Sequence, residues 1–237
     1  GHATETAGRV PVDDKRAARM CVSDRTQESR TPELRVIGLI LLLAVVTRLP
    51  FMFEYVIDWD ESTYILLARS ILDGNLLYTT LWDSKPPVGI VTLAGAMALF
   101  GKSIVGVRIV GLLGVVVSAY LVHRLARALA DARTAVLATT IYIVSVTAIG
   151  SGQATMLEHI AMPLVLGAVL LCLRATVTPI HGFAAGVLVA GATLTRTNLG
   201  LLAPVLGVWL FASQWPSDRR RAFAATAAYL AGGLAVV

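Results

Sequence analysis

Charged residues are scarce in this sequence. They make up only 15% of the 237 residues, whereas 56% are hydrophobic and the mean hydropathy is +0.73. An ordinary soluble domain is about 25% charged. Because a helix satisfies its own backbone polar groups in lipid, these values exclude a chain of soluble domains and predict an all-α, multi-pass membrane protein.

The scarcity of cysteine and the lack of a strongly basic run exclude further classes of function. Of the two cysteines, Cys21 lies in the polar N-terminal part and Cys172 inside an apolar run, and neither has neighbours at metal-ligand spacing. No Lys- and Arg-rich run with interleaved aromatic residues is present, which argues against a nucleic-acid partner. The net charge of +5 instead comes mostly from the ends of apolar runs, where basic side chains set orientation and contact membrane lipids.

The chain divides into a tail and a membrane domain. Segment 1–35 is polar and without apolar periodicity, which predicts a disordered cytoplasmic tail. Segment 36–237 predicts a transmembrane domain, and its last apolar run ends without a closing charge, so we expect a chain truncated at its C-terminus or an unusually short member of its class. The predicted spans are 36–53, 104–122, 134–150, 156–173, 182–195, 199–213 and 222–237. No small-residue cleavage site follows the first apolar run, which predicts an uncleaved anchor.

The short apolar run 88–100 decides the predicted orientation. If it does not cross and the N-terminus is cytoplasmic, the inner side holds Arg124, Arg127, Arg133, Arg174, Arg219, Arg220 and Arg221, and the outer side only Lys102, Arg108 and Arg196. Crossing would reverse this excess, which the positive-inside rule disfavours. We therefore predict a plasma-membrane protein in which 88–100 dips into the outer leaflet or lies along it.

Segment 54–87 is then the first outer loop, and it collects charges that are costly at a membrane surface. They are Asp58, Asp60, Glu61, Asp83 and Lys85. Under the predicted orientation, Glu158 and Arg196 reach the same outer side. Polar groups that converge from distant sequence positions predict a functional site.

Asp60 and Glu61 allow two interpretations. In the structural one, Asp60 caps a helix over 62–72, Glu61 complements its dipole, and Gly74 ends it. In the functional one, Asp60 lies at the end of a short surface helix, with Tyr64 on the same face, and removes the proton from an acceptor hydroxyl.

The remaining candidates also have alternatives. Two prolines hold Lys85 extended as a phosphate-binding cation, although a lysine at a span end can instead snorkel. Arg196 lies between two short apolar runs, and its guanidinium suits either a phosphate or lipid headgroups. Glu158 belongs to the site or is solvated in its loop, and His159 is interpreted as a local hydrogen-bond partner. Arg48 is interpreted as a snorkelling anchor.

These residues resemble a known family, the family 39-like glycosyltransferases, which include protein O-mannosyltransferases and aminoarabinose-type transferases. The resemblance covers about 36–215 and rests on Asp60-Glu61 with Tyr64 and Ala68, Gly74, Tyr78, Asp83-x-Lys85-Pro86-Pro87, Leu99-Phe100-Gly101 and Arg108. Glu158 falls where the family usually carries an acidic residue. The Gly-x-x-x-Thr-Arg stretch ending at Arg196 is similar to the family's Leu-Thr-Lys/Arg element.

The resemblance implies a GT-C fold, a helical membrane bundle whose first outer loop carries short surface helices. It implies a polyprenyl-phosphate-linked sugar donor, a protein, lipid or glycan acceptor, and inversion at the anomeric carbon. Ser84 stands where aminoarabinose-type enzymes often have an acid, so transfer to lipid A is disfavoured.

The resemblance also implies roles for individual residues. Asp60 would be the base with Glu61 supporting it, and Glu158 would assist at the acceptor or at a metal. Lys85 and Arg196 would bind the donor phosphate. The substrate would also contact Asp58, Tyr64 and Asp83. Some members bind a divalent metal ion near these acids, for which Asp60 and Glu158 are the candidate ligands here.

Two other classes of function stay open. The short spans around Arg196 also fit a transporter or flippase-like protein that binds an anionic lipid or solute. That alternative predicts a polar route through the bundle, yet few acids or bases occur deep in the later spans. A non-catalytic protein that binds polyprenyl phosphate is the third alternative.

Overall fold

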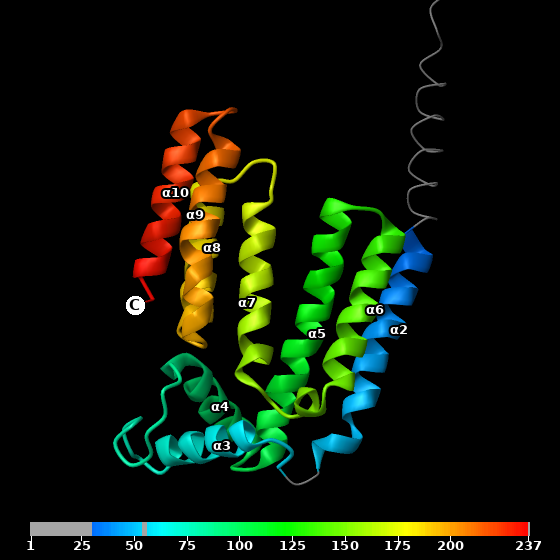
Figure 1. The fold of residues 1–237 in the computed structure, drawn as a ribbon, viewed down its shortest axis with the longest axis vertical. Helices are drawn as coiled ribbons and strands as arrows, with labels where there is room; N and C mark the ends of the chain where they lie inside the picture. Colours follow the sequence, from blue (N-terminus) through cyan, green and yellow to red (C-terminus); the bar gives the residue numbers. More distant parts are fainter. Residues whose placement is uncertain (1–29, 54–55, 237) are drawn as a thin grey trace, which may run out of the picture. The chain divides into compact units, whose positions relative to one another are not determined.

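The computed structural model describes residues 30–53 and 56–236, and every regular element within them is a helix. In chain order these are α2 (Arg30–Arg48), η1 (Pro50–Met52), α3 (Trp59–Leu72), α4 (Pro87–Phe100), α5 (Ile104–Leu129), α6 (Ala132–Ala148), η2 (Gly150–Gln153), α7 (Leu157–Cys172), α8 (Pro179–Thr193), η3 (Thr197–Leu201), α9 (Leu202–Gln214) and α10 (Arg219–Leu234), where η marks a 3-10 helix. The predicted all-α class is confirmed for the described residues (Figure 1).

The chain divides at residue 39, and the contacts given below belong to the unit that starts at Ile40. Helix α2 begins at Arg30, so the last residues of the predicted tail 1–35 are helical. The rest of that tail, 1–29, lies outside the described residues.

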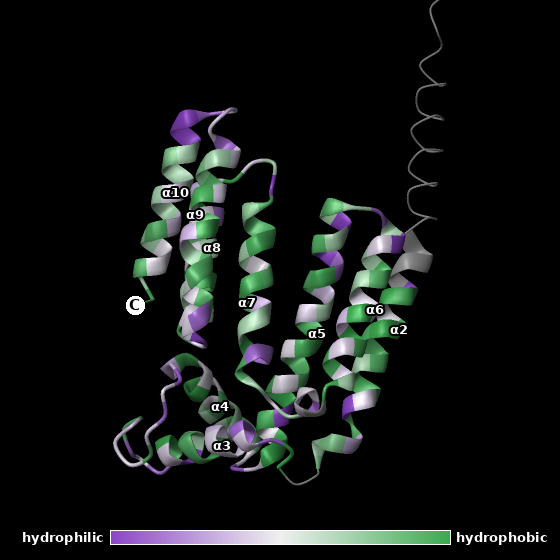
Figure 2. Ribbon diagram, in the orientation of Figure 1, coloured by the Kyte–Doolittle hydropathy of each residue, from purple (hydrophilic) through white to green (hydrophobic). Residues whose placement is uncertain are grey.

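Each predicted span coincides with a helical segment. Ile104–Leu129 and Thr197–Gln214 have the length and hydropathy to cross a membrane, whereas α4, α6, α7 and α8 are apolar but shorter. Large apolar side chains remain exposed along α5, α6 and α9, as at Leu113, Leu137 and Val208, which suits contact with lipid. Figure 2 shows hydrophobic residues along the helices and hydrophilic ones gathered mainly near their ends and around α3.

Small residues allow the long helices to approach closely. A Cβ added at Gly182 or Gly186 of α8, or at Gly232 of α10, would overlap a backbone carbonyl oxygen of the opposite helix. Gly114 of α5 lies in the same way against the backbone of His159 in α7. Such contacts replace the hydrophobic driving force that lipid does not supply between membrane helices.

Helix α3 lies across the ends of the long helices instead of beside them, and α4 lies between α3 and the start of α7 (Figure 1). One apolar cluster joins these elements; it contains Tyr64, Leu67 and Ala68 of α3, Ile90, Leu93 and Met97 of α4, Val107 of α5, and Leu157. Helix α4 has 14 residues, fewer than the ~20 that a helical crossing needs. The packing therefore fixes α3 and α4 at one end of the bundle.

Candidate active site

Helix α3 is capped by a different residue from the one that the structural interpretation of Asp60 and Glu61 expected. Asp58 is the N-cap, and its side chain accepts a hydrogen bond from the Asp60 backbone N–H at 2.9 Å. The expectation that Asp60 caps the helix is therefore wrong by two residues. Asp60 lies in the first turn of α3, and its carboxylate does not cap the helix. Gly74, with φ +89°, follows the end of α3 as predicted.

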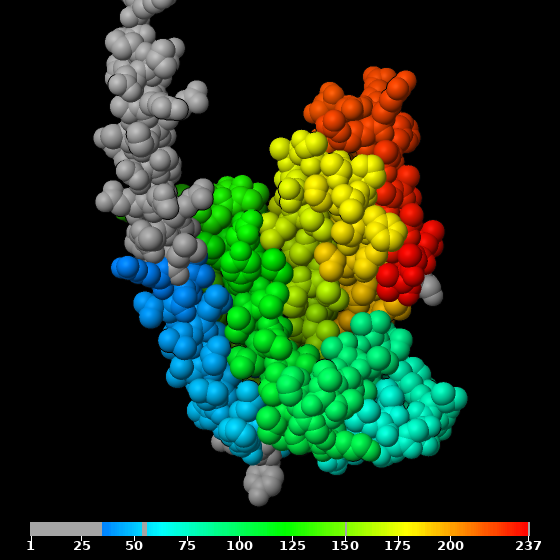
Figure 3. Space-filling view, turned by 180° about the vertical axis from the view of Figure 1, so that it is seen from behind, coloured from blue at the N-terminus to red at the C-terminus, as the bar shows by residue number. Residues whose placement is uncertain are grey.

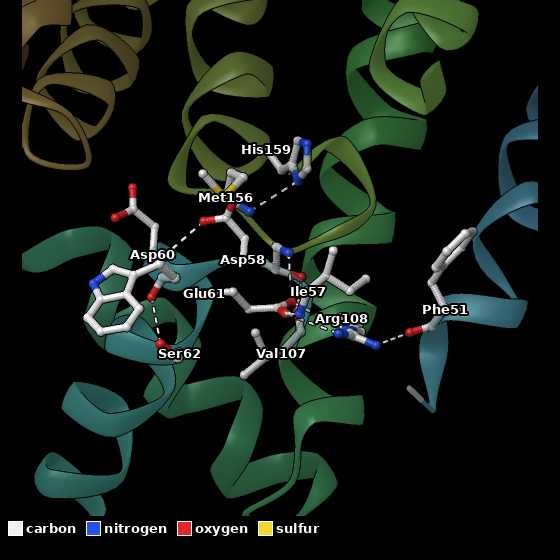
Figure 4. A network of polar contacts seen from close by, with 12 residues as sticks. Phe51, Ile57, Asp58, Asp60, Glu61, Ser62, Val107, Arg108, Met156 and His159 are labelled. Carbon is white, nitrogen blue, oxygen red and sulfur yellow. Dashed lines mark hydrogen bonds and ion pairs between the residues drawn. The ribbon is translucent and has the colours of Figure 1, made fainter. Parts of the chain in front are cut away.

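Glu61 points away from Asp60 into a buried polar network (Figure 4). Arg108 donates from Nη2 to Glu61 Oε2 at 3.0 Å and from Nε to Oε1 at 3.3 Å. Backbone N–H groups of Thr155 and Ile57 donate to the same carboxylate at 2.8 and 3.3 Å. Arg108 also donates from Nη1 to the carbonyl oxygen of Phe51. One ion pair thus ties α5 to both sides of the loop that leads into α3 and to the segment before α7.

This network buries Glu61 among protein partners. Its side chain is 0% exposed and that of Arg108 is 3% exposed, so neither offers an atom to a substrate in solvent. We interpret the pair as the anchor that fixes the direction of Asp60. The sequence alone identified Arg108 as an outer charge and a motif residue, although an arginine inside the first turns of an apolar span signals a buried partner.

Arg48 is the clearest error of the sequence-based interpretation. It was expected to snorkel, but it is 5% exposed and donates from Nη2 to the carbonyl oxygen of Gly152. Gly152 belongs to η2, so this bond joins the end of α2 to the segment before α7. Arg48 therefore holds a loop instead of reaching the membrane surface.

Asp60, Tyr64 and Lys85 form the centre of the candidate site. The Tyr64 hydroxyl donates to Asp60 Oδ2 at 3.2 Å, and Lys85 Nζ lies 5.8 Å from the centroid of the Tyr64 ring. Burial, together with the Asp60 carboxylate, raises the pKa of Tyr64 well above its usual range. Tyr64 therefore stays protonated at neutral pH and remains a hydrogen-bond donor to Asp60.

The chain bends at Lys85, and its backbone there is held by Tyr78 on one side and by the start of α4 on the other. The Tyr78 hydroxyl donates to the carbonyl oxygen of Lys85, and Pro86 and Pro87 begin α4. Burial and the nearby Asp83 carboxylate raise the pKa of Tyr78, which keeps that donor protonated. Lys85 Nζ lies 3.8 Å from Asp83 Oδ1, and its side chain is 27% exposed, so the ammonium remains accessible.

Glu158 and Arg196 join the site from distant parts of the sequence. Arg196, between α8 and η3, donates from Nη1 to Glu158 Oε1. The Val88 backbone N–H donates to the carbonyl oxygen of Leu194 at 3.0 Å, which ties the start of α4 to the end of α8. The charges of Glu158 and Arg196 both act on the Tyr64 hydroxyl, Glu158 raising its pKa and Arg196 lowering it. The structure therefore pairs Glu158 with Arg196 and places both charges within range of Tyr64.

The described residues contain no group of three or more His, Cys, Asp or Glu side chains that could hold a metal ion. Glu158 Oε2 is buried and has no hydrogen-bond partner among these residues. Magnesium is often bound by one or two carboxylates together with substrate phosphates, so Asp60 and Glu158 stay the candidate ligands. His159 accepts from the Met156 backbone N–H at 3.3 Å, the local role expected for it.

Comparison with protein families identifies a relationship. A family model described as dolichyl-phosphate-mannose-protein mannosyltransferase matches residues 84–237, well over half of the chain. The matched segment includes Lys85, Arg108, Glu158 and Arg196 and begins after Asp60 and Glu61. No curated protein and no solved structure matches the chain. The match confirms the resemblance inferred from the sequence.

Proposed function

The chain belongs to the dolichyl-phosphate-mannose-protein mannosyltransferase family, a family of GT-C-type membrane glycosyltransferases, and on that basis we propose the reaction that its candidate site carries out. It moves a sugar from a polyprenyl-phosphate-linked donor to an acceptor hydroxyl, with inversion at the anomeric carbon. The observation that supports this proposal is the position of Tyr64, which donates to the Asp60 carboxylate, lies 5.8 Å from Lys85 Nζ and is also acted on by the charge of Arg196.

The three groups match the charges that this reaction develops. The acceptor oxygen attacks the anomeric carbon while the bond from that carbon to the phosphate oxygen breaks. Asp60 accepts the hydroxyl proton, which otherwise makes the acceptor a poor nucleophile. Lys85 and Arg196 stabilise the negative charge that grows on the departing polyprenyl phosphate.

Glu158 has a defined part in this arrangement. Its Oε1 accepts from Arg196, which fixes one edge of the guanidinium and leaves other N–H groups for a phosphate. Asp83 lies beside Lys85 in the same way. Each cation thus has an acidic neighbour that orients it before the donor arrives. Asp58 caps the start of α3, and we assign it no direct contact with substrate.

We further propose that this end of the bundle faces the outside of the plasma membrane and that the N-terminus is cytoplasmic. The C-terminal ends of α5 and α7 and the N-terminal end of α10 lie away from α3, and their arginines give that end the basic excess expected on the cytoplasmic side (Figure 1). A cysteine at Lys102, beside α3, should react with a membrane-impermeant maleimide in intact cells. Labelling only after the cells are opened would show that the protein has the opposite orientation.

The donor site is tested by native mass spectrometry of the protein in mild detergent with added polyprenyl-phosphate-hexose. We expect the unmodified chain to retain the lipid, and Lys85→Ala and Arg196→Ala each to weaken retention by about 10- to 100-fold, since a hydrogen bond to a charged group contributes ~1.5–3 kcal/mol.

Lys102→Ala is the matched control for this measurement. Lys102 lies at the same end of the bundle and pairs with Asp73 at 2.6 Å, but it is 53% exposed and outside the candidate site. Retention should be unchanged in this variant. Equal retention by all four proteins, or none by the folded unmodified chain, would remove Lys85 and Arg196 from the donor site.

A further inference from the structure

A groove opens between α5, α7 and α8, at the ends of α5 and α7 that lie away from α3 (Figure 3). Its volume is about 440 Å³. Its walls include the aliphatic side chains of Leu121, Leu170 and Leu188. Gly167 helps to keep it open, because a Cβ there would lie 3.3 Å from Leu188 Cδ1.

Two arginines give this apolar groove a positive rim. Arg124 is near the C-terminal end of α5 and Arg174 follows α7, and both line the groove. Arg124 donates from Nη1 to the neutral Tyr120 hydroxyl at 3.0 Å and forms no ion pair with another residue of the described part of the chain. The Arg174 side chain forms no ion pair with any residue between 30–53 or 56–236, and no acidic residue lines the groove.

We propose that this groove binds an anionic phospholipid of the bilayer. The two guanidinium groups contact its phosphate, and the leucine side chains contact the first part of its acyl chains. Basic pockets between membrane helices bind anionic headgroups in this way, because phosphate and guanidinium charges match and aliphatic walls exclude water. A zwitterionic lipid contacts the same apolar walls, but its headgroup carries a positive charge that the arginines repel.

The groove is separate from the candidate active site. Lys85, Glu158 and Arg196 lie where α4 and α7 begin and α8 ends, whereas the groove lies toward the opposite ends of α5 and α7. Lipid binding here does not depend on transfer activity, and its loss would leave the proposed reaction chemically intact. The experiment below is therefore independent of the donor-binding test.

The test is competition between phosphatidylglycerol and phosphatidylcholine, supplied in equal amounts to the delipidated protein and read by native mass spectrometry. We expect the unmodified chain to retain one phosphatidylglycerol in preference. The double variant Arg124→Gln/Arg174→Gln should bind it about 30-fold more weakly, since each basic residue near the surface contributes ~1 kcal/mol and 1.4 kcal/mol is tenfold. Retention of phosphatidylcholine should hardly change.

Two further variants distinguish lipid binding in the groove from a general effect of the positive charge at this end of the bundle. Arg133→Gln/Arg220→Gln removes the same charge from exposed positions outside the groove and should retain phosphatidylglycerol fully. Leu170→Trp should weaken its binding without any change of charge, by filling the groove. Equal binding by the Arg124/Arg174 variant, or equal loss in the Arg133/Arg220 control, would overturn the proposal.

Discussion

Replacing Asp60 with Asn should lower the rate of sugar transfer by about 10²- to 10⁴-fold, the usual contribution of one positioned base. The amide is nearly isosteric and can still accept the hydrogen bond that Tyr64 donates at 3.2 Å. Binding of the polyprenyl-phosphate-linked donor should therefore persist, because the cations that contact its phosphate are unchanged. The measurement is single-turnover transfer from a radiolabelled donor, with donor retention measured on the same sample.

Two further variants test whether the loss of transfer is specific to Asp60. Asp73→Asn removes an exposed carboxylate just after α3, and it should leave the transfer rate unchanged. Tyr64→Phe removes only the hydroxyl that orients Asp60, and we expect a loss of about tenfold in kcat with little change in KM, in line with one hydrogen bond of ~1–1.5 kcal/mol. Normal transfer by Asp60→Asn would exclude Asp60 as the base.

Replacing Arg108 with Gln should destabilise the protein by about 3–5 kcal/mol, the typical cost of leaving one charge of a buried ion pair unpaired. The Glu61 carboxylate would lose its charged partner and keep the backbone donors of Ile57 and Thr155. The loop before α3 would also lose the bond between Arg108 and the carbonyl oxygen of Phe51. Thermal unfolding in detergent, followed by size-exclusion fluorescence, measures the change.

The exposed pair of Lys102 and Asp73 is the control for this prediction. Its side chains are 53% and 60% exposed, so Lys102→Ala should change stability by less than about 1 kcal/mol. The double variant Glu61→Gln/Arg108→Gln should be more stable than Arg108→Gln, because no charge remains unpaired. If Arg108→Gln unfolds at the temperature of the unmodified chain, the pair does not anchor the loop.

The Lys-Pro-Pro element shows how far local sequence can be used for prediction. Proline fixes φ and suits the first turn of a helix, so the start of α4 at Pro87 followed from the sequence alone. The helical segments followed from apolar runs bounded by charges, with ends displaced by a few residues. The capping residue of α3 was misassigned, because Asp58 and Asp60 are both good N-cap residues and only the fold chooses between them.

The sequence by itself determined the class of this protein. Scarce charge and long apolar runs require helices in a membrane, and the acids and cations at the ends of those runs are the residues for which we predict a functional site. Only the tertiary structure decided which charges pair. Glu61 and Arg108 are 47 positions apart, and Glu158 and Arg196 are 38 apart. Such distances along the chain carry no local signal, because the partner of a buried charge depends on which helices pack together.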